Sequence, residues 1–429
     1  MRPSTRTPSH GDDMALSRVA RALARAHRAG KSSGELFSVR QSRACHDAVS
    51  LATPTSSARA VSDEDRYWFD TNGFLILRNV FSREDVAVRR ARRLGYFLCG
   101  VSRGDAVDRC RVGVGGWMIG RGWERRGGAR RATRRRWMRS RTDDVGAFAQ
   151  AMNAAIDKRA DDPGTERKGN LRLTRKGGPL SGDGVTGRRD VAGFLGWPAG
   201  EREAFRRVLA HEKLIPYLHE FVGIGYRLDH NPLCIAQDPG AEGFEFHGGS
   251  TLDDGRWNWP LAYSYTHGQI RNNLLAVSVP LTNVNENEGG FVIVRGSHKS
   301  NFAAPPSVKR YESGVEHGYS PKLNAGDAIL FSEATTHGTL AWKGKAQRRT
   351  LIYRFAPSTA AYGRGYKDKW PETWYDGMNP AQRAVLEPPY HPRLDRDAVA
   401  DDGINVIKPA PREAHKVDFD EKVFKSKYF

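Results

Sequence analysis

The chain has 429 residues, and 39% of them are apolar, which is enough for a hydrophobic core in one large or two ordinary domains. No run approaches the roughly 20 consecutive apolar residues that a bilayer-spanning helix needs, so the sequence predicts no membrane span. About half of the net charge of +19 lies in one stretch, because thirteen arginines and only three acids lie between Arg103 and Arg141.

The N-terminal residues 1–60 are rich in Arg, Ser and Ala. Within them, residues 14–28 carry no acid and could form a basic amphipathic helix of the kind found in organelle transit peptides. A plain disordered tail is the alternative. The four cysteines have no CxxC spacing, which favours a reducing compartment, and we therefore expect an intracellular protein, either cytoplasmic or organellar.

The arginine-rich stretch, taken as residues 100–145, shows neither helical nor strand periodicity. It is interpreted as a disordered insertion or as sequence retained by a faulty gene model. A nucleic-acid contact through Arg and Trp is the third reading, and we rank it below the other two because blocks of like charge are commonly solvated. The sequence therefore gives only this hint of a nucleic-acid partner, and it predicts that removing the stretch spares catalysis.

Short apolar runs punctuated by Gly, Asn and Pro continue through the rest of the chain, with no βαβ alternation. This pattern predicts a mainly β fold with flanking helices, a double-stranded β-helix or jelly roll, over residues 61–360. Apolar residues at near-helical spacing in 201–223 predict helices that cover one face of the barrel. Residues 361–429, rich in Pro and charge, are expected to form an extended tail that packs on the barrel.

Two histidines end predicted strands ninety residues apart: His247 follows the run that begins at Phe244, and His337 follows a second such run. Two imidazoles that converge in a barrel mouth can hold a divalent iron. Arg348 and Arg349 begin the next strand, and a guanidinium fork binds a carboxylate with two hydrogen bonds. Alternate residues of a strand share a face, so only one of these arginines is expected to point inward.

The order of these motifs resembles the phytanoyl-CoA dioxygenase family of Fe(II)- and 2-oxoglutarate-dependent oxygenases. The motifs that carry the resemblance are an opening strand at 70–80, a proximal His247, a Gly-Gly-Phe to Gly-Ser-His-Lys block at 289–299, a distal His337-Gly, and Arg348 eleven positions later. The resemblance implies a cupin-like jelly roll in which His247 and His337 hold Fe(II). It also implies that Arg348 rather than Arg349, helped by Thr339, binds the far carboxylate of 2-oxoglutarate, and that O2 is the second co-substrate.

One position departs from the family pattern, which usually places an Asp or Glu two residues after the proximal His. Here that position is Gly249. Water could fill the place of the carboxylate, Asp253 or Asp254 could reach back from the following loop, chloride could bind as in related halogenases, or the site could be inactive.

The loop after His247 is long and aromatic, so we interpret it as a lid or a substrate wall. Its candidate substrate-side residues are Trp257, Trp259, Tyr263, Tyr265 and His267. The first hypothesis is an oxygenase that hydroxylates a small organic or lipid-like substrate. An inactive jelly-roll binding protein is the second, and a halogenase that uses the vacancy at Gly249 for chloride is the third.

Overall fold

The computed structural model describes residues 61–81, 148–159, 161–162, 166–172, 177–363, 370–389, 396–409 and 413–425. The predictions for residues 1–60 and 100–145 therefore lie outside the described residues. Among the helices in the described ranges, none is both long and apolar enough to cross a membrane.

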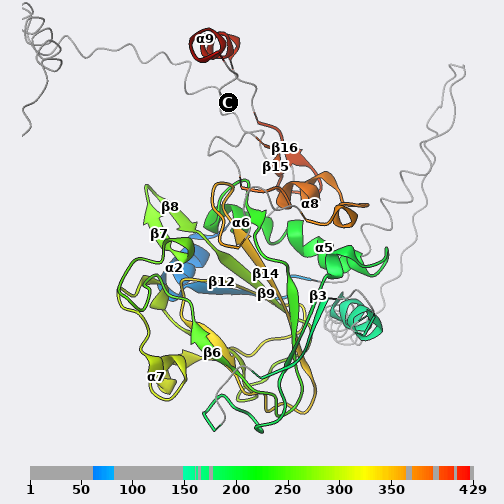
Figure 1. Ribbon diagram of the computed structural model, residues 1–429, viewed down its shortest axis with the longest axis vertical. Helices are drawn as coiled ribbons and strands as arrows, with labels where there is room; N and C mark the ends of the chain where they lie inside the picture. The colour runs from blue at the N-terminus through cyan, green and yellow to red at the C-terminus, as the bar shows by residue number, and fades with distance from the viewer. Residues whose placement is uncertain are drawn as a thin grey trace, which may run out of the picture. The chain divides into compact units, whose positions relative to one another are not determined.

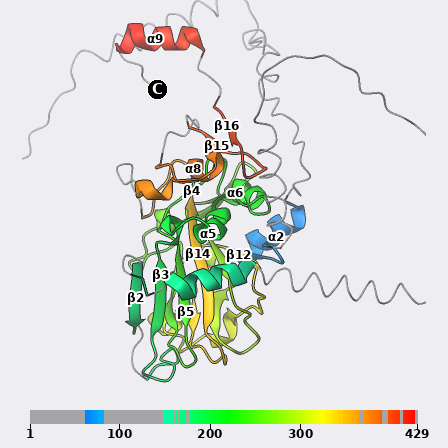
Figure 2. The same ribbon diagram turned by 90° about the vertical axis from the view of Figure 1, so that its right-hand side faces the viewer.

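Two antiparallel sheets form the body of the fold (Figure 1). The larger sheet has, in spatial order, β1 (Phe74–Leu77), β12 (Ala328–Ser332), β9 (Leu275–Pro280), β14 (Arg348–Ala356), β5 (Leu233–Gln237), β3 (Arg188–Ala192) and β2 (Glu166–Leu171), with β4 (Arg227–Leu228) paired to β14. Figure 2 shows several of these strands, from β2 and β3 to β14 and β12, side by side. The smaller sheet has the order β11 (Gly318–Tyr319), β10 (Gly290–Val294), β13 (His337–Leu340) and β6 (Phe244–His247).

The chain alternates between the two sheets from β5 onward: β5 lies in the larger sheet, β6 in the smaller, β9 in the larger, β10 and β11 in the smaller, then β12, β13 and β14 in turn. This connectivity is that of a double-stranded β-helix, so the predicted fold class is confirmed. Because β6 and β13 pair antiparallel in the smaller sheet, the end of β6 and the beginning of β13 lie at the same mouth of the barrel.

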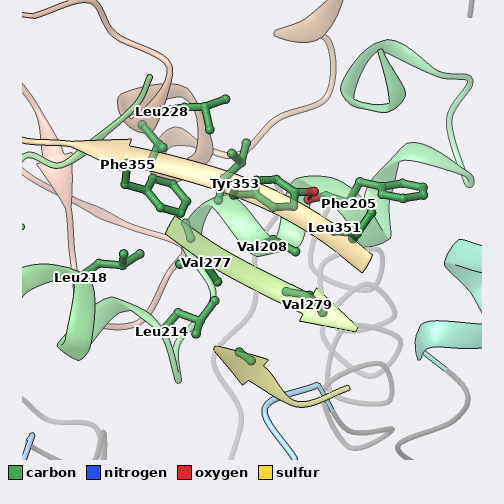
Figure 3. Packing of buried hydrophobic residues seen from close by; sticks show 14 of the residues in the cluster. Phe205, Val208, Leu214, Leu218, Leu228, Val277, Val279, Leu351, Tyr353 and Phe355 are labelled. Atoms are coloured by element: carbon green, nitrogen blue, oxygen red, sulfur yellow. Dashed lines mark hydrogen bonds between the residues drawn. The ribbon is translucent and has the colours of Figure 1, made fainter. Parts of the chain in front are cut away.

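One face of the larger sheet packs against helices, as the helical spacing in 201–223 predicts. These helices are α5 (Arg202–Arg207), the 3-10 turn η3 (Val208–Ala210) and α6 (Ile215–Phe221). Figure 3 shows their buried side chains against β9 and β14: Phe205, Val208, Leu214 and Leu218 face Val277, Val279, Leu351, Tyr353 and Phe355. The odd-numbered residues of β14 from 349 to 355 therefore face the helices, and the even-numbered residues face the barrel interior.

The barrel interior contains both apolar and polar side chains. An apolar cluster includes Phe74, Ile293, Ile329 and Phe331. Strands β9 and β14 contribute the buried hydroxyls of Ser278 and Thr350, which a hydrogen bond of 3.0 Å joins.

The described chain begins with α2 (Asp63–Asn72), capped by Ser62, whose hydroxyl accepts a hydrogen bond of 3.1 Å from the Asp65 amide. It ends at Gly73, where φ is +80°, and β1 follows. The chain leaves the described range after Phe81 and returns with a helix over residues 148–159. Phe81 stacks on Phe148 with ring centroids 4.7 Å apart, so the two ends of the intervening segment meet.

Residues 370–425 contain regular structure where an extended tail was predicted. They form the turn η7 (Glu372–Trp374), helix α8 (Pro380–Val385), the hairpin β15 (Ala398–Val399) and β16 (Val406–Ile407), and helix α9 (Ala414–Phe424). Trp374 and Val385 belong to the main hydrophobic core. The buried guanidinium of Arg206 on α5 donates to the Trp374 carbonyl at 2.7 Å, which fixes this segment to the helical layer.

Candidate metal centre

The structure brings the two predicted histidines together at the mouth of the barrel. His337 begins β13 and lies directly opposite His247, the last residue of β6, in the strand register. Their ring centroids are 4.3 Å apart at an interplanar angle of 53°. His337 is buried, whereas His247 is partly open to solvent.

Hydrogen bonds to the backbone fix the tautomer of both imidazoles. Nδ1 of His247 lies 3.0 Å from the carbonyl oxygen of Glu245, and Nδ1 of His337 lies 2.7 Å from that of Thr335. A carbonyl oxygen can only accept, so each Nδ1 carries the proton and each Nε2 presents a lone pair. Burial lowers the pKa of both rings below the ordinary value for histidine, which keeps both imidazoles neutral.

Glu333 completes a three-residue cluster with these histidines, and ligand atoms of the three side chains all lie within 4.8 Å of one another. Glu333 directly follows β12, and its amide donates to the Leu274 carbonyl at 3.1 Å. A turn from Ser332 to Thr335, closed by a hydrogen bond of 2.9 Å, then carries the chain to His337. Burial alone would raise the pKa of this carboxyl, but the charged guanidinium of Arg354 beside it holds the pKa well below its usual range, so Glu333 is ionised.

Glu333 and His337 approach each other through two atoms that carry no proton, so they form no hydrogen bond. Oε2 of Glu333 lies 3.5 Å from Nε2 of His337, and both atoms are acceptors when the imidazole is neutral with its proton on Nδ1. A cation bound by both atoms would turn this unfavourable approach into a favourable one. Two neutral imidazoles and one carboxylate form the donor set of non-haem iron(II) oxygenases, so the residues present fit that metal.

Neither of the loop acids named as third-ligand candidates joins the cluster. Asp253 is exposed and forms an ion pair with Lys309, and Asp254 is exposed and pairs with Arg256 at 2.6 Å. Gly249 has a φ of +103°, and a Cβ built there would meet only the Thr251 carbonyl oxygen, at 3.7 Å. The carboxylate of the cluster is that of Glu333, four residues before the distal histidine, which the sequence motifs do not single out.

Arg348 and Arg349 point in opposite directions from β14, as the strand alternation predicts. Arg348 is buried in the barrel interior, where it donates to the side-chain oxygen of Gln237 at 2.7 Å and its Nε has no hydrogen-bond partner. Burial lowers the pKa of Arg348 to about 10, so the guanidinium stays charged at neutral pH. Arg349 lies on the helical side, in an ion pair with Asp157, and is therefore not in the site.

A row of polar side chains that includes Arg348 crosses three neighbouring strands of the larger sheet. Gln237 on β5 lies directly opposite both Arg348 on β14 and Arg188 on β3. The Arg188 guanidinium lies 5.0 Å from the centroid of the Phe244 ring and donates to Asp190 at 3.0 Å. A buried cation whose hydrogen-bonding capacity is incompletely used calls for an anionic ligand. Sequence reasoning missed Gln237 and Arg188, which only the strand register reveals.

Thr339 is buried on β13 two residues after His337, so both side chains face the barrel interior. The residues predicted on the substrate side divide into two groups. Trp257 and Trp259 line a surface groove of about 990 Å³ together with residues of α6 and the segment 357–360. The others do not line it: Tyr263 donates a hydrogen bond to Asp70, while Tyr265 and His267 are exposed in the hairpin of β7 (Tyr263–Thr266) and β8 (Gln269–Asn272).

Residues 189–350 match the family model described as phytanoyl-CoA dioxygenase (PhyH), which confirms the resemblance read from the motifs. This range includes the two histidines, Glu333 and Arg348. Comparison with curated proteins yields no match.

Among solved structures, the chain is similar to HygX from Streptomyces hygroscopicus with nickel, 2-oxoglutarate and hygromycin B bound, at 16% identity, with 70% of this chain and 90% of HygX covered and a TM-score of 0.41. It is also similar to EctD from S. alaskensis with 2-oxoglutarate and 5-hydroxyectoine, at 15% identity, with 77% and 89% covered and a TM-score of 0.42.

Proposed function

We propose that this chain, whose residues 189–350 match the phytanoyl-CoA dioxygenase family model, is an Fe(II)- and 2-oxoglutarate-dependent oxygenase that hydroxylates a small organic or lipid-like substrate. The observation that carries the proposal is the gathering of His247, Glu333 and His337 within 4.8 Å. This donor set leaves coordination positions open for a co-substrate and for dioxygen.

Each residue of the site has a role in this proposal. His247, Glu333 and His337 would hold the iron. Arg348, oriented by Gln237 and assisted by Thr339, would bind the far carboxylate of 2-oxoglutarate. When bound, Fe(II) with 2-oxoglutarate and O2 supplies the oxidation of a substrate C–H bond to C–OH, with release of succinate and CO2.

The groove beside Trp257 and Trp259 is proposed as the substrate side. Its wall includes Asn273 and Pro357. Asn273 precedes Leu274, whose carbonyl accepts from Glu333, and Pro357 lies three residues after Arg354. None of the cluster residues lines the groove, so it neighbours the metal centre only through these adjoining chain segments. Its two indole rings offer apolar area for a substrate.

The missing family carboxylate after His247 leaves two alternative functions, an inactive binding protein and a halogenase. The inactive binding protein needs a site without a carboxylate, and the halogenase needs a position left vacant for chloride. Glu333 supplies a carboxylate, so it favours the hydroxylating oxygenase over both.

Anaerobic titration with Fe(II) and 2-oxoglutarate tests the proposal. We expect a visible charge-transfer band in the wild-type protein, which chloride leaves unchanged and which Glu333→Gln removes while the far-UV circular dichroism is retained. Asp254→Asn is the matched control and should keep the band, because Asp254 lies outside the cluster. Folded wild-type protein without a band, or a band that depends on Asp254 and not on Glu333, contradicts the proposal.

A further inference from the structure

We propose that Arg354 is a positioning residue for the metal centre: it binds one oxygen of Glu333 and thereby holds the other oxygen toward the two histidines. This inference rests on the proposed function, since it concerns how the same cluster receives its carboxylate. It gives a role to an arginine that the resemblance to the dioxygenase family does not single out.

The two carboxylate oxygens of Glu333 have different neighbours. Oε1 accepts a hydrogen bond of 2.5 Å from Nε of Arg354, while Oε2 lies 3.5 Å from Nε2 of His337. The Glu333 side chain is 5% exposed, so water does not compete strongly for either oxygen. With Oε1 held by a charged donor, Oε2 is the oxygen left to face the imidazoles, and the carboxylate is set up to bind a cation through one oxygen.

The backbone on both sides of this ion pair is fixed. Arg354 lies on β14 with Ala276 opposite it on β9, and its carbonyl accepts from the Asp229 amide at 2.9 Å. Glu333 is held by the hydrogen bond that its amide donates to the Leu274 carbonyl. The side-chain contact is therefore what selects the orientation of the carboxylate. Glu333 follows β12 and does not stand two residues after the proximal histidine. Its carboxylate therefore has to be oriented by a contact particular to this site.

The charge of Arg354 also lies close to the cluster, and it opposes cation binding. Two effects therefore compete: orientation of Glu333 strengthens metal binding, and repulsion weakens it. Hydrogen-bond partners that orient metal ligands are typically worth about 10- to 100-fold in metal affinity. The positive charge is largely neutralised by the carboxylate that it contacts, so we expect orientation to dominate.

The experiment measures the affinity of the folded protein for Mn(II) alone by isothermal titration calorimetry, without 2-oxoglutarate or turnover. Arg354→Met keeps the aliphatic stem and loses the donor, and we expect it to weaken Mn(II) binding about 10- to 100-fold. Arg354→Lys, which keeps the charge but loses the planar fork, should fall between this variant and the wild type. Arg349→Met is the matched control on the same strand and should leave the affinity unchanged, because Arg349 faces the helices.

A double-mutant cycle with Glu333→Gln separates positioning from general stabilisation. If Arg354 acts through Glu333, Arg354→Met causes no further loss of Mn(II) affinity in the Glu333→Gln background. Equal or tighter binding by Arg354→Met, or an undiminished loss in that background, overturns the inference while the proposed function stands. Absence of Mn(II) binding in the wild type instead overturns the proposed function and this inference with it. If Arg354→Met does not fold, Arg354→Lys tests the inference alone. A Mn(II) affinity of Arg354→Lys equal to that of the wild type would refute the positioning role.

Discussion

Gly290 has no side chain, and this leaves space for Arg348, the proposed ligand of 2-oxoglutarate. A Cβ at Gly290 would lie 2.7 Å from Nε of Arg348, and the backbone there has a φ of +82°. Both facts require glycine at this position, for space and for backbone conformation. Gly290 begins β10, and only the structure shows that its missing side chain leaves space for the guanidinium.

The opposite directions of Arg348 and Arg349 lead to a paired prediction. Arg348→Lys replaces a planar fork by a single ammonium, so the KM for 2-oxoglutarate should rise about 10- to 100-fold, or roughly 1.4 to 2.8 kcal/mol of binding. Arg349→Lys should change this KM by less than about twofold, because the side chain pairs with Asp157 on the helical side. Steady-state succinate formation measures both. Equal effects of the two variants would contradict the assignment of Arg348.

The residues that sequence reasoning found and missed differ in one respect. His247, His337 and Arg348 stand at positions fixed by motif spacing, so they could be named from the sequence. Glu333 and Arg354 have no such motif and meet only because β12 and β14 both border β9. Strand order of this kind arises from long-range pairing, which single-sequence patterns do not specify.

Strand β14 contributes side chains both to the hydrophobic core and to the candidate site. Its odd-numbered residues from 351 pack under α5 and α6, while Arg348 and Arg354 face the interior. The sequence alternation predicts these two faces. It does not predict the C-terminal elements, because α8 spans only Pro380–Val385 and its segment reads as rich in Pro and charge.

Removing the N-cap of α8 tests how much this C-terminal segment contributes to the stability of the fold. Asn379 accepts a hydrogen bond from the Gln382 amide at 2.8 Å, and the Gln382 side chain accepts from the Asn379 amide at 3.1 Å. Asn379→Ala should lower the free energy of unfolding by about 1 kcal/mol, and Asn379→Asp should preserve it. Urea denaturation gives both values. If alanine leaves the midpoint unchanged, this segment does not unfold together with the barrel.

The described residues form two large hydrophobic clusters, one between the larger sheet and its helices and one inside the barrel, and a small third one of Leu261, Leu274 and Ala356. His298 joins α2 to the barrel. Its Nε2 donates to the Asp70 carbonyl at 2.9 Å, and its ring meets that of Tyr263 edge-on with centroids 4.6 Å apart. Burial lowers the pKa of His298 from 6.5 to about 4.

Acid should therefore destabilise the fold through His298. Between pH 6.5 and 4 the unfolded chain binds a proton there that the folded chain does not, so the associated stability is present above pH 6.5 and is lost as the pH falls to about 4. The loss is at most on the order of 3 kcal/mol. His298→Gln keeps a donor and does not titrate, so its free energy of unfolding should fall less between pH 7 and pH 4 than that of the wild type. His317→Gln, at an exposed histidine, is the control and should follow the wild type.

The contact between Phe81 and Phe148 bears on the predicted arginine-rich insertion. Because the described chain leaves and returns at neighbouring points, replacing residues 100–145 by a short Gly/Ser linker should leave the barrel intact. We expect unchanged succinate formation and a melting temperature within a few degrees of the wild type. Loss of turnover in a folded deletion variant would assign this stretch a part in catalysis.

The turn that carries both Glu333 and His337 has a consequence for recognising such centres elsewhere. A chain whose proximal histidine lacks a following acid can be searched for Glu-x-x-x-His between the strands that correspond to β12 and β13, with an arginine six residues beyond the co-substrate arginine. Where all three coincide, the proposed relocation of the acid predicts an iron site, and iron binding should be measured before such a sequence is classified as inactive.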